Sequence, residues 1–447
     1  MASPERISIQ GGRLIDPAHG IDRATDLHLA AGRVLAIGTA PADFQPERVI
    51  DARERIVCPG FIDLSARLRE PGLEQKATIE SETRAAAASG ITTLCCPPDT
   101  CPVIDTPAVA QLIQQTAQRH GFARVIPAGA MTQGLEGQQI TEMAALQLAG
   151  CRVLSQADQP IRNALVQRRA MEYAATFGLT LFLRPQDPDL SRGGCAHEGR
   201  VSTRLGLPGI PEAAETVAIA RDLALAGQTG ARVHFRGLST ARAIAILLAA
   251  RRRGVSASAD VSMHQLFLTE DDLDGFDANC HLIPPPRTRT DRDALRQALA
   301  AGELAAVCSD HQPHDADAKL LPFPETAPGL SGLETLLPLA LRLVRAGVMD
   351  LSSILARLTT GPAGILGCDL GHLAPGAPAD VCIFDPTAAW IPTPETIRSH
   401  GQNSPFLGTE MLGRVDRTLL AGRVVFERNG ADSSGPPNSP PPAPRTG

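Results

Sequence analysis

The sequence of 447 residues predicts an α/β protein, in which a (β/α)8 barrel is joined to a small β domain built from both ends of the chain. Three observations predict this fold. Short strand-like runs with glycine turns occur near both ends. Between them, eight apolar runs alternate with helical segments, and the middle region is long enough for a complete barrel.

The two ends of the chain share a strand-and-turn pattern. We expect residues 1–55 to form the N-terminal part of the small β domain and residues 373–429 its C-terminal part, with the barrel at 56–372 between them. The strand-like runs are 7–10, 26–29, 33–37, 379–384 and 418–426.

The middle region alternates strands and helices in the order that a barrel requires. Helical stretches at 80–89, 212–226 and 241–253 have apolar faces and end near glycines, which favour the left-handed turn after a helix. The predicted barrel strands are 61–66, 92–97, 124–129, 152–157, 180–184, 232–237, 256–261 and 304–309.

Composition excludes several classes of function. A net charge of -6 gives no basic excess for nucleic acid or an anionic membrane surface. No leader peptide or bilayer-spanning apolar run is evident, so we expect a cytoplasmic protein. Residues 430–447 are rich in Pro and Ser and poor in apolar side chains, which predicts a disordered tail.

The ten cysteines do not suggest a metal site. Cys95, Cys96 and Cys101 form the one cluster, and no C-x-x-C pair is present. We expect them to be buried reduced thiols.

The run F-I-D-L-S-A-R-L-R-E-P-G at 61–72 resembles the end of the first barrel strand in the cyclic amidohydrolase superfamily, and its flanks resemble dihydroorotase. The resemblance extends over nearly the whole chain and implies a barrel of the metal-dependent hydrolase type. It also implies two histidine metal ligands at positions where this chain has Ser65 and Arg67. Ser is a poor zinc ligand, and Arg stays protonated and only donates hydrogen bonds.

The other strand ends depart from the family pattern in the same way. Gln156 and Ala157 stand where the family has bridging ligands, and Asp158 reaches that place only by a shift in register. His234 matches a histidine that is not a ligand. The positions of lost metal ligands are Ser65, Arg67, Ala157, Arg184 and Gly237.

Strand eight keeps the family signature, S-D-H-Q-P-H at 309–314. By resemblance Asp310 matches the general base and metal ligand, while His311 and His314 match positions near the substrate. One carboxylate cannot hold a catalytic metal, because such sites need three or more protein ligands. We therefore expect no zinc cofactor and no catalytic residues, with these three as vestiges.

The substrate-like pocket is mixed. Arg69 matches a residue that grips the substrate carboxylate, whereas Asp99 and Ile283 replace polar contacts of the family. An ionised Asp99 would repel an anionic substrate.

We expect guanidinium groups to fill the vacated cationic centre. Arg67, Arg184 and Arg236 would pair with Asp310, and with Asp99 or Asp187. In the alternative interpretation these arginines reach solvent.

Three functions are consistent with the sequence. The first, which we favour, is a pseudoenzyme: a non-catalytic dihydroorotase-like subunit in a hetero-oligomer with the aspartate carbamoyltransferase catalytic chain, in de novo pyrimidine biosynthesis. This partner is implied by the resemblance alone. The second is an active dihydroorotase or related cyclic amidohydrolase with an altered or metal-free site. The third is a small-molecule sensor without turnover.

Overall fold

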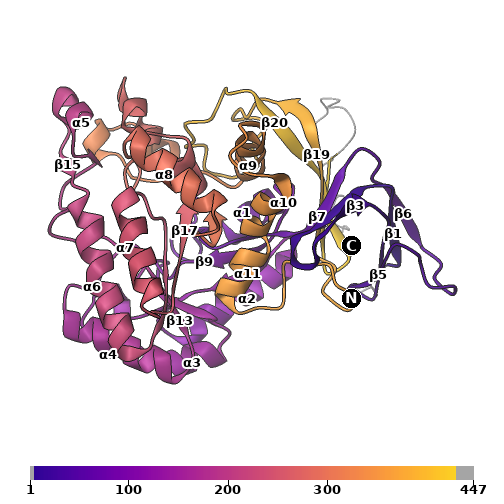
Figure 1. Cartoon of the computed structure of the whole chain (residues 1–447), viewed down its shortest axis with the longest axis horizontal. Helices are drawn as coiled ribbons and strands as arrows, with labels where there is room; N and C mark the ends of the chain where they lie inside the picture. The colour runs from indigo at the N-terminus through magenta and orange to yellow at the C-terminus, as the bar shows by residue number, and fades with distance from the viewer. Residues whose placement is uncertain (1–4, 429–447) are drawn as a thin grey trace, which may run out of the picture.

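The computed structural model describes residues 5–428 and confirms the barrel and the small β domain (Figure 1). Parallel strands of the barrel pair in the order β8-β9-β10 and β11-β12-β13-β16-β17-β18. The ring closes where His311 N donates to Ser65 O at 3.0 Å and Arg67 N donates to His311 O at 2.9 Å. The strands are β8 (Phe61–Asp63), β9 (Ile91–Cys96), β10 (Arg124–Pro127), β11 (Gly129–Ala130), β12 (Val153–Ser155), β13 (Thr180–Leu183), β16 (Arg232–Phe235), β17 (Ala257–Ser262) and β18 (Ala306–Cys308).

Helices cover the outside of the barrel, and their ends follow local sequence signals (Figure 1). Thr78 caps α1 by accepting from Ser81 N, and Thr240 caps α7 by accepting from Ala243 N. The helix α6 ends at Gly230, whose φ of 71° is left-handed. The helices are α1 (Ile79–Ala88), α2 (Pro107–His120), α3 (Met143–Leu148), α4 (Ala164–Thr176), α5 (Arg200–Leu205), α6 (Ala213–Thr229), α7 (Ala241–Arg252), α8 (Arg289–Ala300), α9 (Leu336–Arg345), α10 (Leu351–Leu358) and α11 (Thr360–Leu366).

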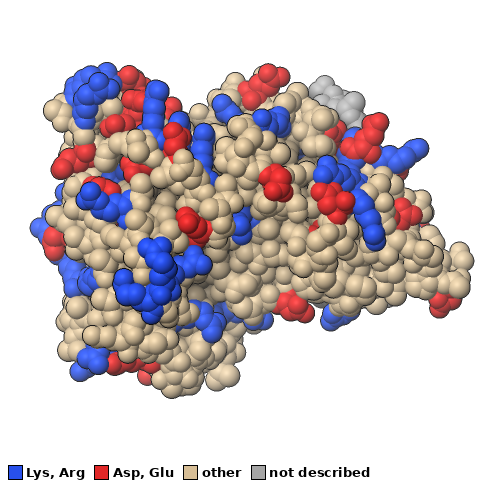
Figure 2. All heavy atoms as spheres, viewed as in Figure 1, with Lys and Arg blue, Asp and Glu red and all other residues tan. Residues whose placement is uncertain are grey.

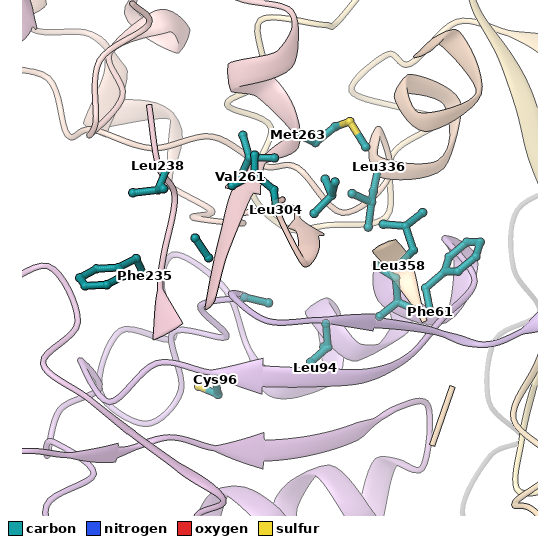
Figure 3. Packing of buried hydrophobic residues seen from close by; sticks show 14 of the residues in the cluster. Phe61, Leu94, Cys96, Phe235, Leu238, Val261, Met263, Leu304, Leu336 and Leu358 are labelled. Carbon is teal, nitrogen blue, oxygen red and sulfur yellow. The ribbon is translucent and has the colours of Figure 1, made fainter. Parts of the chain in front are cut away.

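Two apolar layers hold the barrel. The larger lies between strands and helices and includes Phe61, Leu94 and Val261 (Figure 3). The smaller includes Ile62 and Phe182. Burial of this apolar surface is the main stabilising contribution to the fold.

The thiols are partly as expected. All ten cysteines are unpaired, and Cys95 and Cys96 are buried, but Cys101 is exposed because it lies in the loop after β9. The expectation of a buried thiol was wrong at Cys101.

The small β domain consists of two sheets, in the orders β5-β4-β1-β6 and β21-β20-β19-β7-β2-β3. Residues 56–59 lie within the range expected for the barrel, but β7 pairs with β2 and β19 in this domain. The chain enters the barrel at Gly60, where a Cβ would collide with the Thr92 side chain. The strands are β1 (Ile7–Gln10), β2 (Arg13–Asp16), β3 (Ile21–Ala24), β4 (Leu27–Ala30), β5 (Arg33–Ile37), β6 (Arg48–Asp51), β7 (Ile56–Pro59), β19 (Val381–Trp390), β20 (Met411–Leu420) and β21 (Arg423–Glu427).

Acidic and basic side chains both occur across the face of the molecule shown in Figure 2. Among the described helices, none has the length and apolar character needed to cross a bilayer. The tail expected at 430–447 lies outside the described residues.

Candidate functional site

Charged side chains converge at the carboxyl ends of the barrel strands, where barrel enzymes carry their chemistry. They lie just beyond β8, β9, β12, β13, β16 and β18, so the barrel brings together residues that are far apart in sequence. We call this set the arginine–aspartate cluster: Arg67, Arg184, Arg236, Asp99, Asp158 and Asp310.

Arg67 bridges two carboxylates at the mouth. Its Nε donates to Asp99 Oδ2 at 2.6 Å, and its Nη2 donates to Asp158 Oδ2 at 2.6 Å. Its Nη1 lies 4.0 Å from Asp310 Oδ1. The Arg67 side chain is only 4% exposed, so these charge-assisted contacts lie in an environment that screens them weakly.

Arg184, which follows β13, contacts Asp158 and Asp310. Its Nε forms an ion pair with Asp158 Oδ1 at 2.5 Å, without the geometry of a directed hydrogen bond, and its Nη2 donates to Asp310 Oδ2 at 3.4 Å. Its Nη1 donates to the carbonyl of Ile283 at 2.7 Å. The backbone of Ile283, and not its side chain, therefore takes part in the site.

Arg236 reaches Asp310 through a hydroxyl. Its Nη2 donates to Ser65 Oγ at 2.5 Å, and Ser65 Oγ donates to Asp310 Oδ1 at 3.0 Å. The same Nη2 lies 3.7 Å from Asp310 Oδ1. Ser65, at the position of a lost ligand, thus bridges the buried Arg236 cation and the buried Asp310 anion by accepting from one and donating to the other.

The cluster balances its charges, because three guanidinium groups face three carboxylates. Burial opposes ionisation of Asp310, but the positive charges of Arg184 and Arg236 outweigh it and lower its pKa. Burial likewise opposes the charge on Asp158, and Arg184 and Arg67 lower its pKa. All three arginines expected at the vacated centre lie beside Asp310, and the solvent-reaching alternative does not describe them.

A metal centre does not fit these residues. Asp310 is engaged by guanidinium groups, whose charge repels a cation. Ala157 and Gly237 offer no side-chain donor, and a Cβ on Gly237 would lie 3.7 Å from Arg184 Nη1. Within residues 5–428 no three His, Cys, Asp or Glu side chains are arranged to hold a metal ion.

Asp158 was underestimated by the sequence argument, which admitted it only through a shift in register. It follows Ala157, which has a left-handed φ of 49°, and its carboxylate receives both Arg67 and Arg184. Asp187, the other expected partner, instead accepts from the backbone N–H groups of Asp189 and Leu190 and takes no part in the cluster.

His311 is held away from this chemistry. Its Nε2 lies 2.7 Å from Glu82 Oε2, and its Nδ1 accepts from Gly332 N at 3.2 Å. Glu82 also accepts from Ser399 Oγ at 2.7 Å. The Nε2 contact thus links the barrel to α1 and, through Glu82, to Ser399, while Nδ1 holds the backbone at Gly332.

Beside the cluster, the His314 ring lies between the cations Arg69 and Lys76. Arg69 Nε donates to Pro313 O at 3.0 Å, and Lys76 Nζ donates to His314 Nδ1 at 3.2 Å. Burial and the charge of Arg67 lower the pKa of Arg69 to about 10. Burial and the charges of Arg69 and Lys76 lower the pKa of His314 to about 3, so this imidazole is neutral at pH 7.

Two further histidines, His234 and His264, are buried in or beside the barrel. His234 contacts Ser258 Oγ at 2.8 Å and Asp260 Oδ2 at 3.1 Å inside the barrel, so it packs and does not act as a ligand. His264 was missed by the sequence argument. It is buried beside the cluster, and within the described residues neither ring nitrogen has a hydrogen-bond partner. Burial lowers its pKa to about 4. Its position directly after β17 is a signal that would have found it.

Comparisons with known proteins identify the family of this chain. A family model described as "Dihydro-orotase-like" matches residues 54–242, and one described as "Amidohydrolase family" matches residues 195–425. A "Dihydroorotase-like protein" of Pseudomonas aeruginosa is 50% identical over 94% of this chain and 99% of its own length. A "Dihydroorotase" of Anaeromyxobacter dehalogenans is 41% identical over 95% of this chain and 98% of its own length.

Solved structures show the same fold. An L-hydantoinase (dihydropyrimidinase) from Arthrobacter aurescens has a TM-score of 0.85 at 23% identity and covers 95% of this chain and 96% of its own. A dihydropyrimidinase from Brevibacillus agri NCHU1002 has a TM-score of 0.80 at 22% identity, covering 94% and 95%. The fold, the retained motif at 309–314 and these relatives lead to one conclusion: this chain belongs to the dihydroorotase-like proteins of the amidohydrolase family.

Proposed function

We propose that this chain is a non-catalytic dihydroorotase-like subunit that supports the assembly or activity of aspartate carbamoyltransferase in pyrimidine biosynthesis. It holds no zinc and acts in the cytoplasm. The observation that supports a non-catalytic role is the arginine–aspartate cluster, in which guanidinium groups surround Asp310 where the family has metal ligands.

The groups that hydrolysis would require are absent from several positions of the site. Hydrolysis of a cyclic amide needs a nucleophile made from water and a group that polarises the carbonyl, and metal ions supply both in this type of site. The Asp310 carboxylate is paired with arginines, which hold it ionised but lower its basicity. His311 is committed to Glu82. This arrangement supports loss of the hydrolytic function.

A retained use of the fold is supported by its integrity. The Pseudomonas aeruginosa and Anaeromyxobacter dehalogenans relatives align over 94% and 95% of this chain, and the barrel closes through backbone hydrogen bonds of His311 with Ser65 and Arg67. A barrel that keeps its shape without its chemistry can still offer a surface to a partner. The transferase is proposed as the partner because the resemblance of this chain to dihydroorotase-like proteins implies it.

Co-purification from the native host tests the partner. Tagged full-length chain is isolated, and the complex is weighed by native mass spectrometry. The proposal expects the transferase catalytic chain in a fixed ratio, and loss of transferase assembly when this chain is deleted. Recovery of this chain without the transferase, and normal transferase assembly in the deletion strain, would contradict it.

A His314→Ala variant separates the partner role from the catalytic alternative. His314 lies in the substrate-like pocket, where it contacts Arg69 and Lys76 and none of the arginines of the cluster. The partner role expects this variant to restore transferase assembly in the deletion strain. A catalytic role expects the variant to fail to support growth without added pyrimidine, although assembly is normal.

A further inference from the structure

A cavity of about 160 Å³ lies between α1 and α9 of the barrel and β19 to β21 of the small β domain, in the region where Figure 1 shows α9 beside β20. It shares no residue with the arginine–aspartate cluster. Its principal lining residues are Trp390, Phe426, Arg398, Arg414 and Glu334.

Two aromatic rings and two guanidinium groups line the cavity in matched pairs. Arg414 Cζ lies 5.5 Å from the centre of the Trp390 ring, and Arg398 Cζ lies 5.2 Å from the centre of the Phe426 ring. Cation–π contacts of this kind hold the cations at the ring faces. Each cation covers one face of its ring, so the wall places aromatic rings and positive charge side by side.

Trp390 is fixed in place by the backbone. Its Nε1 donates to Gly413 O at 3.1 Å. Gly413 has a φ of 106°, and a Cβ there would collide with Leu341, so only glycine fits this close approach. The indole is thus positioned before any ligand arrives, which lowers the entropy cost of binding.

The lining carries a net positive charge, since Arg398, Arg414 and Arg428 outnumber Glu334 and Glu427. Glu427 is paired with Arg48 and Arg417, outside the cavity lining. The carboxylate of Glu334 accepts from the backbone N–H groups of Arg398 and Ser399 at 2.8 and 3.1 Å. Burial raises the pKa of Glu334 to about 7, so part of its negative charge is absent at neutral pH.

We propose that this cavity binds a small planar organic anion, a ring carboxylate whose ring lies against Trp390 and Phe426 and whose charge faces Arg398. The size fits, because a cavity of about 150 Å³ accepts benzene. Arg398 stands at the exposed rim, where a carboxylate can keep part of its hydration. The site is independent of the proposed function and does not require the transferase.

The chain provides its own reporter, since Trp390 is the one tryptophan in the sequence. Full-length protein is titrated with benzoate, and with benzamide as the uncharged isostere, while Trp390 fluorescence is recorded. We expect a saturable change with benzoate and about tenfold weaker binding of benzamide. Arg398→Gln should weaken benzoate binding about tenfold, and Arg398→Lys should retain most of it.

The matched control is Arg162→Gln. It removes an exposed arginine that pairs with Asp189, and neither residue lines the cavity. It should bind benzoate as the wild type does. A fluorescence change that stays linear in benzoate, equal responses to benzoate and benzamide, or unaltered binding in Arg398→Gln would each overturn the proposal. The comparison of the two probes uses the wild type alone, so it does not depend on the folding of a variant.

Discussion

Removal of the central carboxylate should destabilise the protein strongly. Asp310→Asn keeps the size of the side chain and an oxygen that can accept from Ser65, but it deletes the charge that faces Arg184, Arg236 and Arg67 at 3.4, 3.7 and 4.0 Å. All four side chains are at most 4% exposed, so solvent cannot replace the lost charge.

The expected cost can be bounded. Breaking a buried ion pair from one side costs about 3 to 5 kcal/mol. Asp99 and Asp158 still neutralise Arg67 and Arg184 in the variant, so we expect the lower end, about 3 kcal/mol, in the free energy of unfolding. That is a large part of the stability of an ordinary domain.

Urea unfolding followed by far-UV circular dichroism measures this cost. The control is Asp189→Asn, since Asp189 is 63% exposed and pairs with exposed Arg162 and Arg192. It should change the free energy of unfolding by less than about 0.5 kcal/mol. If Asp310→Asn lies within about 1 kcal/mol of the wild type, the cluster does not depend on this charge and our reasoning is refuted.

The difference should also depend on pH. The pKa of Asp310 is lower in the folded protein than in the unfolded chain, so its stabilising contribution is present above about pH 4 and is lost as the pH falls further. The gap between wild type and Asp310→Asn should therefore narrow in acid.

Three further changes test single parts of the structure. Arg236→Met should lower the free energy of unfolding by about 3 kcal/mol, because it removes a buried cation that faces Asp310 and donates to Ser65, and it leaves three carboxylates of the cluster facing two guanidinium groups. Asp222→Asn should stabilise the protein at pH 8 but not at pH 4: burial raises the pKa of Asp222 to about 6, so its ionised form costs stability as the pH rises from about 4 through 6. Gly237→Ala should cost about 1 kcal/mol, because φ there is 61°. Urea unfolding at the stated pH checks each; an Arg236→Met variant as stable as the wild type, a pH-independent Asp222→Asn or a neutral Gly237→Ala would contradict the corresponding argument.

The barrel strands could be predicted from the sequence because each is a short apolar run followed by polar residues. The expected run 232–237 contains β16, and 180–184 contains β13. The domain boundary at Gly60 was harder to predict from the sequence. The strand β7 is as apolar as a barrel strand, and only its pairing with β2 and β19 places it in the small domain. Pairing between distant segments leaves no local signal.

The site was predictable in its charges and less so in its geometry. Arg67, Arg184 and Arg236 were expected around Asp310, since cations at strand ends of one barrel face a common centre. The role of Asp158 depends on the left-handed turn at Ala157, which residue type alone does not indicate.

His311 shows the reverse case. Its motif suggests a place at the mouth, but Glu82 on α1 takes its Nε2, and that contact spans 229 residues of sequence. Contacts of this length follow from packing of the complete fold.

The most direct test of the central claim is zinc binding and turnover in the same sample. Purified full-length protein is incubated with zinc, freed of excess metal, analysed for bound zinc and assayed for hydrolysis of dihydroorotate. The arginine–aspartate cluster predicts no stoichiometric zinc and no hydrolysis above the uncatalysed rate. Stoichiometric zinc together with zinc-dependent turnover would contradict it.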